Sequence, residues 1–443
     1  MLDKAKSFYD KLPKRCLAFL RNVPDQFLFG PRYRLERLAA SCDKKLVPSR
    51  LYKALIYARE HTEYGKDVIP NDFCPEEAPE LLRELPCISS EDLSKNLLHH
   101  VSDVFGATNS YRTTTGGTGR SPTSIVLANE SYAVEWAHMH TMWSYIGYDR
   151  RRHLKLTLRG KRSGRDSLVA YNPLYNELVV NTFKLSYESF PRLWDEAFNQ
   201  PVRYVHSYPS LLKEFMEYCV YFDKRPKLSG IMLASEGCTV EDKAAFRQFF
   251  DCPVLSWYGQ SEKVALAYDL AGTNEFRLFT TYGYAHILDP DPHGFGEITA
   301  TTFSNPALPL FNYRTGDSGR LEVRDDGFYL CDVSGRWGKD FVWMDRTKRI
   351  PTASINLHSD IQNEILFYQL IQSAYGRLHI KVLPKKTSRL KSWEILQIVQ
   401  HEIADKLNDF SVTAEIAPDE THIIKSPRGK MIMLVQNLRP LQT

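Results

Sequence analysis

The middle of the chain alternates short apolar runs with helical patterns, and no other feature restricts the fold as strongly. The apolar runs predict strands over residues 202–206, 230–234 and 253–257. Between them we predict one helix that Ser207 caps and Pro209 enters in its first turn, and a second helix over 240–250. This alternation is typical of parallel βαβ units. Ligands of such sheets gather at the carboxyl ends of the strands.

The segments on either side of this core carry their own patterns. The first hundred residues are predicted to be mainly helical, with helical spacing over 51–60 and a helix start at Ser89 or Ser90. From 297 to 332 short strands and turns predominate, including a hairpin signal at 325–327. The remaining predicted elements are a short apolar run over 124–127, an aromatic-rich helix over 131–148, a strand over 378–382, a helix over 392–407 and a strand over 414–417.

We therefore expect an α/β fold with two domains. A length of 443 residues allows two or three domains of roughly 150 residues each. The large N-terminal domain is predicted over 1–337, with parallel or mixed sheets, flanking helices and a mainly helical lead-in over 1–100. A small α+β domain is predicted over 338–443, because the change of pattern falls near 335–340.

Composition excludes several classes of protein. The 43% apolar and 25% charged residues indicate a globular chain, and a net charge of +4 gives no concentrated basic footprint for nucleic acid. The apolar runs are short and interrupted by charge, so we expect neither a membrane span nor a secretory signal. The eight cysteines form no CxxC pair, which argues against a zinc site or a redox dithiol. We expect a cytoplasmic enzyme with reduced thiols.

Three short motifs in this framework carry chemistry: TTTGGTG at 113–119, YGQSE at 258–262 and YRTGD at 313–317. The glycines of the first motif let backbone amides converge on an anion, and its threonines add hydroxyl donors, which predicts a phosphate site. It is not the Walker loop, because no GK[ST] follows at that spacing. The alternative is a flexible loop that joins two strands.

The other motifs supply charged side chains. Glu262 is a candidate ligand for magnesium, and the alternative is an acid paired with Lys263 or with solvent. Asp317, in a predicted Gly-Asp turn, can accept hydrogen bonds from both hydroxyls of a ribose, and the alternative is an ordinary turn aspartate. Arg336 follows a glycine, and Lys430 ends the motif SPRGK. Such a lysine can neutralise a developing phosphate oxyanion, and the alternative is a solvated basic tail.

Together, the motifs resemble those of the adenylate-forming superfamily of acyl-CoA synthetases, peptide-synthetase adenylation domains and luciferases. Within it the chain looks most like the phenylacetate–CoA ligase branch, especially CapK-type proteins of capsular polysaccharide biosynthesis. The resemblance runs from about Tyr52 onward and includes the word Tyr208-Pro209-Ser210, a glycine-arginine hinge word and the terminal glycine-lysine. Three departures stand out: one extra residue before Pro122, Thr123 in place of a lysine, and a hinge word, GRWGKD, that is one residue longer than usual.

The resemblance implies a role for each matching residue. Glu262 would bind Mg²⁺, Ser261 would touch the α-phosphate, Tyr258 would stack on adenine, and Asp317 would hold the ribose with Arg336 nearby. Lys430 would bridge the substrate carboxylate and the α-phosphate. The other implied ATP-binding residues are Thr114, Thr115, Gly116, Gly117, Thr118 and Gly119 for the β- and γ-phosphates, Ser235, Glu236 and Gly237 beside adenine, and Gly259.

The implied activity is that of an ATP-dependent, AMP-forming ligase. A carboxylate would become an acyl-adenylate with release of pyrophosphate, and the acyl group would pass to an amine, hydroxyl or thiol while the small domain rotates about Lys339 or Asp340. Acceptors in this reading are a sugar amine or hydroxyl, CoA, or a pantetheinyl carrier protein, with capsule or surface-glycan modification as the setting. Two alternatives are a nucleotidyltransferase that leaves AMP on a hydroxyl and a non-catalytic nucleotide-binding relative. A monomer or homodimer is expected.

Fewer features of the sequence indicate where the acyl substrate binds. Its candidate contacts are Trp136, His140, Trp143, His206 and Tyr208. The alternative, that the aromatic residues of the predicted helix are core, is favoured because aromatic stripes at helical spacing usually pack inside. His138 and His140 lie on different helix faces, which argues against a metal pair. The basic loop 159–165 can receive a phosphorylated acceptor such as CoA or a nucleotide sugar, and the alternative is a solvated loop.

Overall fold

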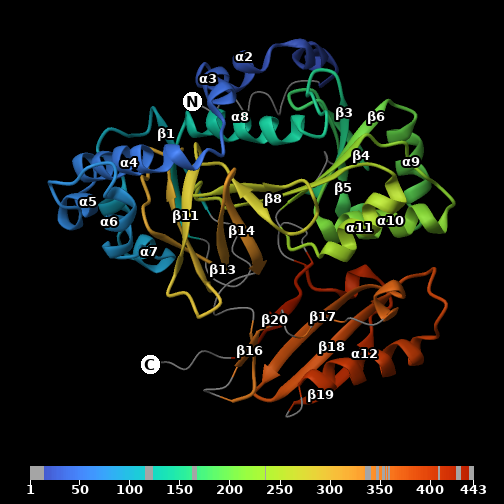
Figure 1. Cartoon of the computed structure of the whole chain (residues 1–443). Helices are drawn as coiled ribbons and strands as arrows, with labels where there is room; N and C mark the ends of the chain where they lie inside the picture. Colours follow the sequence, from blue (N-terminus) through green and yellow to red (C-terminus); the bar gives the residue numbers. More distant parts are fainter. Residues whose placement is uncertain are drawn as a thin grey trace.

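A mixed sheet of twelve strands forms the centre of the molecule (Figure 1). The computed structural model describes residues 14–114, 123–161, 167–234, 236–334, 341–345, 349–351, 355, 357, 360–407, 410–425 and 431–438. The strand order is β11-β12-β13-β14-β10-β9-β8-β7-β6-β3-β5-β4. The strands are β3 (Leu154–Lys161), β4 (Val169–Asn172), β5 (Glu177–Asn181), β6 (Val202–Ser207), β7 (Gly230–Ala234), β8 (Val254–Gly259), β9 (Leu266–Asp269), β10 (Phe276–Leu278), β11 (Gly283–Leu288), β12 (Phe295–Thr302), β13 (Tyr313–Arg324) and β14 (Gly327–Ser334).

One half of this sheet is parallel and the other half is antiparallel. Strands β5, β3, β6, β7 and β8 run parallel to one another, whereas every pairing from β8 to β11 is antiparallel. The crossover helices are α9 (Phe190–Phe198), α10 (Pro209–Tyr221) and α11 (Val240–Phe250), with the short η3 (Thr182–Lys184) before α9. The predicted βαβ units and α/β class are therefore confirmed.

Helices cover both faces of the parallel half. In β7, Ile231 packs in a core with Phe215 of α10 and Phe246 of α11. Its neighbour Met232 points to the opposite face, into a core with Trp143 of α8 (Ser131–Ser144). Alternate side chains of a strand point to opposite faces, so this division makes three layers, with α8 on one side and α10 and α11 on the other.

The chain before this sheet is helical, as predicted. Its elements are η1 (Lys14–Asn22), α2 (Asp25–Phe29), α3 (Arg32–Ala39), η2 (Lys44–Leu46), α4 (Val47–His61), α5 (Glu63–Val68), α6 (Ala78–Glu84) and α7 (Ser90–His100). Ser89 caps α7 and forms a capping box with Asp92, which confirms the predicted helix start. An antiparallel pair, β1 (Ser110–Thr114) and β2 (Ser124–Ala128), flanks the glycine-rich motif. Residues 115–122, which include 115–119 of this motif, lie outside the described part of the chain.

A second, four-stranded sheet forms a separate layer below the first in Figure 1. Its order is β19-β18-β17-β20, and α12 packs Ile395, Val399 and Ile403 into the core of this sheet. A small hairpin, β15–β16, precedes it. The elements are β15 (Phe341–Trp343), β16 (Arg349–Pro351), η5 (Asp360–Asn363), β17 (Ile365–Ala374), β18 (Arg377–Pro384), α12 (Ser392–Lys406), β19 (Ser411–Ile416), η6 (Glu420–His422) and β20 (Leu434–Gln436). The expected boundary between 337 and 338 lies among residues that the structure does not describe, so it stays a prediction.

Two local predictions were wrong. Ser207 is not an N-cap: it ends β6, Tyr208 occupies the cap position without a side-chain cap, and the Ser207 hydroxyl donates to the carbonyl of Tyr208 at 2.8 Å. Asp317 is not in a turn between elements. It lies inside β13 at an irregularity of register opposite Glu297 and Thr299, where Gly316 has a φ of +76°.

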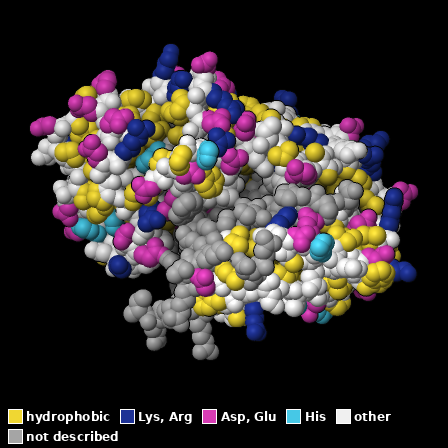
Figure 2. Space-filling model, turned by 60° about the horizontal axis from the view of Figure 1, so that its bottom comes forward, with side chains coloured by type: hydrophobic (Ala, Val, Ile, Leu, Met, Phe, Trp, Pro, Cys, Tyr) yellow, Lys and Arg dark blue, Asp and Glu magenta, His cyan; other side chains and the backbone are white. Residues whose placement is uncertain are grey.

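The smaller sheet contacts the large one through α10. The hydroxyl of Tyr218 donates to Glu420 at 3.1 Å, and the backbone amide of Thr387 donates to Glu217 at 3.0 Å. Lys386 lies over the ring of Tyr187, 3.7 Å from its centroid. Among the described helices, none combines the length and the apolarity needed to cross a membrane. On the face in Figure 2, acidic and basic side chains are interspersed.

Candidate functional site

Two tyrosines each hold one of the two predicted carboxylates. The hydroxyl of Tyr313, at the start of β13, donates to Glu262 Oε1 at 2.9 Å, and Glu262 lies in the turn that follows β8. The hydroxyl of Tyr258, at the end of β8, donates to Asp317 Oδ2 at 2.9 Å. The two motifs therefore exchange hydrogen bonds in both directions. This exchange brings together side chains that are 51 and 59 positions apart in the sequence.

The cations that adjoin these residues in the sequence, Lys263 and Arg314, pair with other acids. Lys263 pairs with Glu135 of α8, and Arg314 donates through Nε and Nη2 to Glu297 Oε2 at 2.9 and 2.6 Å. The alternative in which Glu262 pairs with Lys263 is therefore not what the structure shows. Among the residues that the structure describes, only Tyr313 donates to Glu262, which leaves Oε2 of that carboxylate available to a ligand.

The irregularity in β13 fixes the direction of Asp317. The Thr315 hydroxyl donates to the Ile298 carbonyl at 2.7 Å and accepts from the Asp317 amide at 3.1 Å. The next residue, Ser318, faces Ser334 across the β13–β14 ladder, with the two hydroxyls 2.8 Å apart. Asp317 is thus held by its own strand as well as by Tyr258.

Tyr258 is half-buried, and its hydroxyl stays protonated. Burial and, secondly, the negative charge of Asp317 raise the pKa of Tyr258 well above its ordinary value, so this group donates a hydrogen bond and does not act as a base. Beside it, the side-chain amide of Gln260 is buried, and neither its nitrogen nor its oxygen has a hydrogen-bond partner among the residues that the structure describes. A buried amide without partners is costly unless a ligand or water pairs with it, so this place suits a polar ligand such as a nucleotide.

The ends of neighbouring strands add further groups. Glu236 follows β7 and accepts a hydrogen bond at Oε2 from the amide of Ser210, in the first turn of α10, at 3.0 Å. Gly237 and Gly259 are exposed, and Ser261 is half-buried. This is the carboxyl edge of the parallel strands, where the sequence predicted ligands to gather.

Several predicted site residues lie outside the described part of the chain: Thr115, Gly116, Gly117, Thr118, Gly119, Ser235, Arg336 and Lys430, together with Lys339 and Asp340 of the expected hinge and residues 162–165 of the basic loop. Thr114 ends β1, and only its backbone is described. Lys425 and Met431, which flank the terminal motif, pair as an antiparallel bridge.

The candidate substrate residues of α8 contact one another, because the ring centroid of Trp143 lies 5.9 Å from that of Trp136 and 5.7 Å from that of His140. Trp143 is fully buried and contacts the rings of His206 and Trp257, the latter in β8. Arg159 Nη1 lies 3.2 Å from His206 Nε2, and the guanidinium of Arg159 lies over the ring of Tyr208, 5.2 Å from its centroid. These three candidates lie beside the strands that end at the site.

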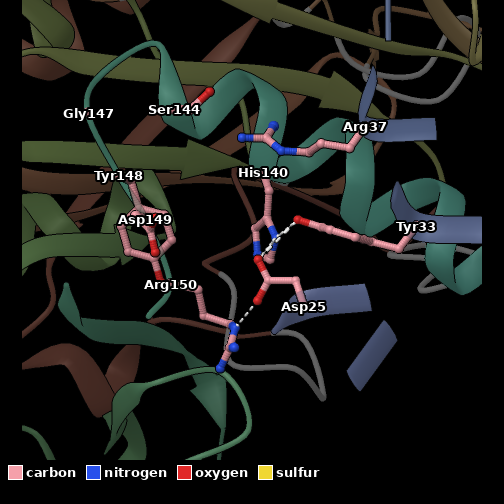
Figure 3. Close-up of a pocket in the computed structure, with 9 residues that line it drawn as sticks. All are labelled: Asp25, Tyr33, Arg37, His140, Ser144, Gly147, Tyr148, Asp149 and Arg150. Carbon is pink, nitrogen blue, oxygen red and sulfur yellow. Dashed lines mark hydrogen bonds and ion pairs between the residues drawn. The ribbon is translucent and has the colours of Figure 1, made fainter. Parts of the chain in front are cut away.

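Trp136 and His140 lie under the N-terminal helices instead. His140 Nδ1 is 2.8 Å from the hydroxyl of Tyr33, and Trp136 stacks on Phe29 with ring centroids 5.3 Å apart. Figure 3 shows His140 with Tyr33 and Asp25 in a cavity of about 240 Å³ that also borders Arg37, Ser144, Gly147, Tyr148, Asp149 and Arg150. Burial lowers the pKa of His140 well below its ordinary value, so the ring is neutral. His138 bonds to Thr281 Oγ1, on another face of α8.

Sequence reasoning missed the acids of α10. Glu214 and Glu217 are almost fully buried, and the hydroxyl of Tyr218 lies 2.6 Å from Glu214 Oε1 and 3.1 Å from Glu420 Oε1. Burial raises the pKa of Glu214 to about 7, against an opposing effect of Lys425. The available signal was two glutamates three positions apart in an otherwise apolar helix.

The sequence matches no protein-family model and none of the curated proteins. Solved structures are similar in fold. A 2-hydroxyisobutyryl-CoA ligase in the postadenylation state, in complex with R3-HIB-AMP, has a TM-score of 0.63 at 15% identity, over 92% of this chain and 91% of the ligase. The GH3.15 acyl acid amido synthetase has a TM-score of 0.54 at 15% identity, over 85% of this chain and 86% of the synthetase.

The conformation of the ligase affects the match. Its structure in the thioesterification state, with 2-HIB-AMP and CoA, gives a TM-score of 0.52 at 14% identity, over 94% of each chain. The twelve-stranded sheet with its smaller C-terminal sheet is the fold of the adenylate-forming ligases.

Proposed function

We propose that this protein is an ATP-dependent, AMP-forming ligase that activates a carboxylate as an acyl-adenylate. The observation that carries the proposal is the reciprocal pair of hydrogen bonds in which Tyr313 holds Glu262 and Tyr258 holds Asp317. It sets two carboxylates at the carboxyl edge of the parallel strands, in a fold that such ligases share. Resemblance of the motifs assigns Glu262 to magnesium and Asp317 to the ribose.

The described residues fit these ligands. Glu262 Oε2 accepts no hydrogen bond from the described residues, and magnesium takes few protein ligands. When bound, Mg²⁺ would neutralise charge on the phosphates. Gln260 offers an amide for a polar edge of the nucleotide, and Arg336 and Lys430 would supply the cations at the α-phosphate.

The reaction follows from these roles. An oxygen of the substrate carboxylate attacks the α-phosphorus in line, the bond to the β-phosphate oxygen breaks, and pyrophosphate leaves. The acceptor then attacks the acyl carbon, its proton is released, and AMP leaves. Positioning and neutralisation of charge are the protein's contributions to the first step. We propose an amine, hydroxyl or thiol as the acceptor, including CoA or a carrier protein, and a small mobile C-terminal domain over 338–443.

The motifs place the protein nearest the phenylacetate–CoA ligase branch and its CapK-type members, which favours the modification of a surface glycan in the cytoplasm. This part of the proposal rests on the motifs alone, since a shared fold does not assign a pathway.

The test is isotope exchange between pyrophosphate and ATP with a panel of carboxylic acids. We expect exchange that depends on one class of acid, and its absence with every acid would contradict the proposal. A stable AMP-labelled product without exchange would indicate a nucleotidyltransferase instead. Lys430→Ala should nearly abolish exchange while transfer from a supplied acyl-adenylate continues. Equal loss in both half-reactions would remove Lys430 from its assigned role.

A further inference from the structure

The N-terminal helices present large apolar side chains to solvent. Phe27 is 73% exposed in α2, Leu35 and Leu38 are 69% and 77% exposed in α3, and Phe19 is 59% exposed in η1. We call these four residues the N-terminal patch. Single exposed apolar residues are common on protein surfaces, but four within twenty positions are a concentration that marks an interaction surface.

These side chains point away from the body of the protein. Phe29 packs on Trp136 of α8, so Phe27, two positions earlier in the same helix, points outward. In α3, Tyr33 packs on His140, whereas Leu35 and Leu38 lie on the opposite helix face together with the exposed Arg34. Figure 1 shows α2 and α3 on the far side of α8 from the twelve-stranded sheet.

The helices that carry the patch are fixed to the large domain. Arg150 donates through Nε to Asp25 at 2.5 Å and through Nη2 to the Val23 carbonyl at 2.6 Å, and Arg32 pairs with Glu130 at 2.6 Å. Burial of Phe29 and Tyr33 adds apolar contact with α8. The outward direction of the patch is therefore a property of the folded protein and does not require the helices to detach.

The charge of the chain is concentrated in the same segment. Residues 1–40 contain nine Lys and Arg against four Asp and Glu, a net charge of +5, whereas residues 41–443 contain 48 against 49. Arg21 and Arg34 are exposed among the apolar side chains of the patch, and Arg37 forms no ion pair with any residue that the structure describes. The segment is thus both apolar and basic, on a protein that is otherwise close to neutral.

We propose that the N-terminal patch docks the protein reversibly on an anionic membrane surface. Apolar side chains interleaved with arginines match the interface of a bilayer, where the acyl boundary takes Phe and Leu and the anionic headgroups attract Arg. An acidic protein surface would match the charge but not four projecting apolar side chains. The four-stranded sheet lies on the opposite side of the molecule in Figure 1, so docking leaves its face towards α10 free.

The experiment is sedimentation of the full-length protein with vesicles. One set is phosphatidylcholine alone, and the other contains phosphatidylglycerol as well. We expect binding to the anionic vesicles only. The double variant Leu35→Ser with Leu38→Ser should weaken it by at least roughly a hundredfold, because two large apolar side chains are then missing from the bilayer interface. Arg34→Glu should weaken it by roughly tenfold and should lower its sensitivity to salt, because less of the remaining binding is electrostatic.

Matched controls lie elsewhere on the surface. Val323→Ser, at a residue that is 62% exposed in β13, and Arg389→Glu, at an exposed residue before α12, should leave vesicle binding unchanged. Pyrophosphate exchange and thermal melting of the patch variants should also be unchanged, since these side chains neither form the site nor fill the core. No binding of the unaltered protein to anionic vesicles would overturn the proposal. Equal losses of vesicle binding in the control variants would also overturn it. The same holds for an oligomer of the unaltered protein that dissociates in the patch variants, because a second copy of the chain would then be the occupant of the patch.

Discussion

The carboxylates at the proposed site and those between the two sheets are held by tyrosines in different ways. At the site, Glu262 and Asp317 each receive a tyrosine hydroxyl of their own. Between the sheets, the single hydroxyl of Tyr218 lies within hydrogen-bond distance of both Glu214 and Glu420. A hydroxyl donates one hydrogen, so the second contact is a hydrogen bond only if one carboxyl carries a proton.

Tyrosines and carboxylates therefore serve different purposes in the two regions. Two carboxylates that each receive a tyrosine hydroxyl of their own are suited to cations and hydroxyl donors, which is what a nucleotide site needs. Two carboxylates that share one donor favour the binding of a proton by one of them. Burial acts in the same direction, because it raises the pKa of Glu214 to about 7. The site is therefore suited to ligands, and the contact between the sheets is suited to a change of pH.

The largest expected effect is at Glu262. Glu262→Gln keeps the size of the side chain and removes its charge, so we expect exchange of pyrophosphate to fall by roughly a hundredfold or more. Glu214→Gln is the matched control, and at pH 6 it should keep most of the activity. Similar losses in the two variants would show that the comparison between the two regions is wrong.

The next effect is on the docking of the smaller sheet against α10. Exposed Glu214 would titrate near its ordinary pKa of 4.5 but near 7 when docked. The docked state therefore holds a proton that the undocked state releases, and docking weakens as the pH rises from about 4.5 through about 7, by at most about 3 kcal/mol. Distance measurements between labels on the two sheets would follow this change. Glu214→Gln should flatten the profile, and an unaltered profile would exclude Glu214 as its source.

A smaller effect separates the two tyrosines of the site. Tyr258→Phe and Tyr313→Phe each remove one hydrogen bond to a carboxylate, which should cost roughly tenfold. Tyr258→Phe should raise the KM for ATP, because Asp317 loses its support. Tyr313→Phe should raise the magnesium concentration that gives half-maximal rate. If both variants changed the same parameter, the assignment of the two carboxylates to different ligands would fail.

The smallest effect concerns Thr387, whose amide and hydroxyl both donate to Glu217. Thr387→Val removes only the hydroxyl, so docking should weaken by roughly fivefold, at every pH alike. The same distance measurement tests this, with Thr413→Val, which lies on β19 and bonds to His379, as the control. A loss that varied with pH would implicate Glu217 in the titration.

Local signals predicted most elements but not their long-range partners. The apolar runs of β6, β7 and β8 and the capping box at Ser89 are encoded within a few residues, and they appear as predicted. The motifs also indicated Glu262 and Asp317 as candidate ligands, which stays a prediction. The tyrosines that hold them could not be assigned, because each hydrogen bond spans more than fifty positions and depends on the register of β8 and β13.

The errors have physical reasons as well. Ser207 has the residue type of a cap, but β6 extends one residue further and takes it into the parallel sheet. The Gly-Asp pair at 316–317 has the composition of a turn, and the long strand β13 absorbs it as an irregularity in which only the glycine takes a positive φ. The aromatic residues of α8 form one contacting row. In it the ring centroids of Trp136 and Trp143 lie 5.9 Å apart, and the row reaches Phe29 at one end and Trp257 at the other.

The pairing of Ser318 with Ser334 has a consequence for how this protein can change over evolution. Ser334 is the last described residue before 335–340, and its partner directly follows Asp317. The starting point of the connection to the smaller sheet is therefore clamped to the strand that carries the proposed ribose ligand. An insertion after Ser334 would fall beyond this pair and would leave the hydrogen bonds of Asp317 unchanged. We therefore expect changes of length after Ser334 to be tolerated without loss of the proposed nucleotide binding.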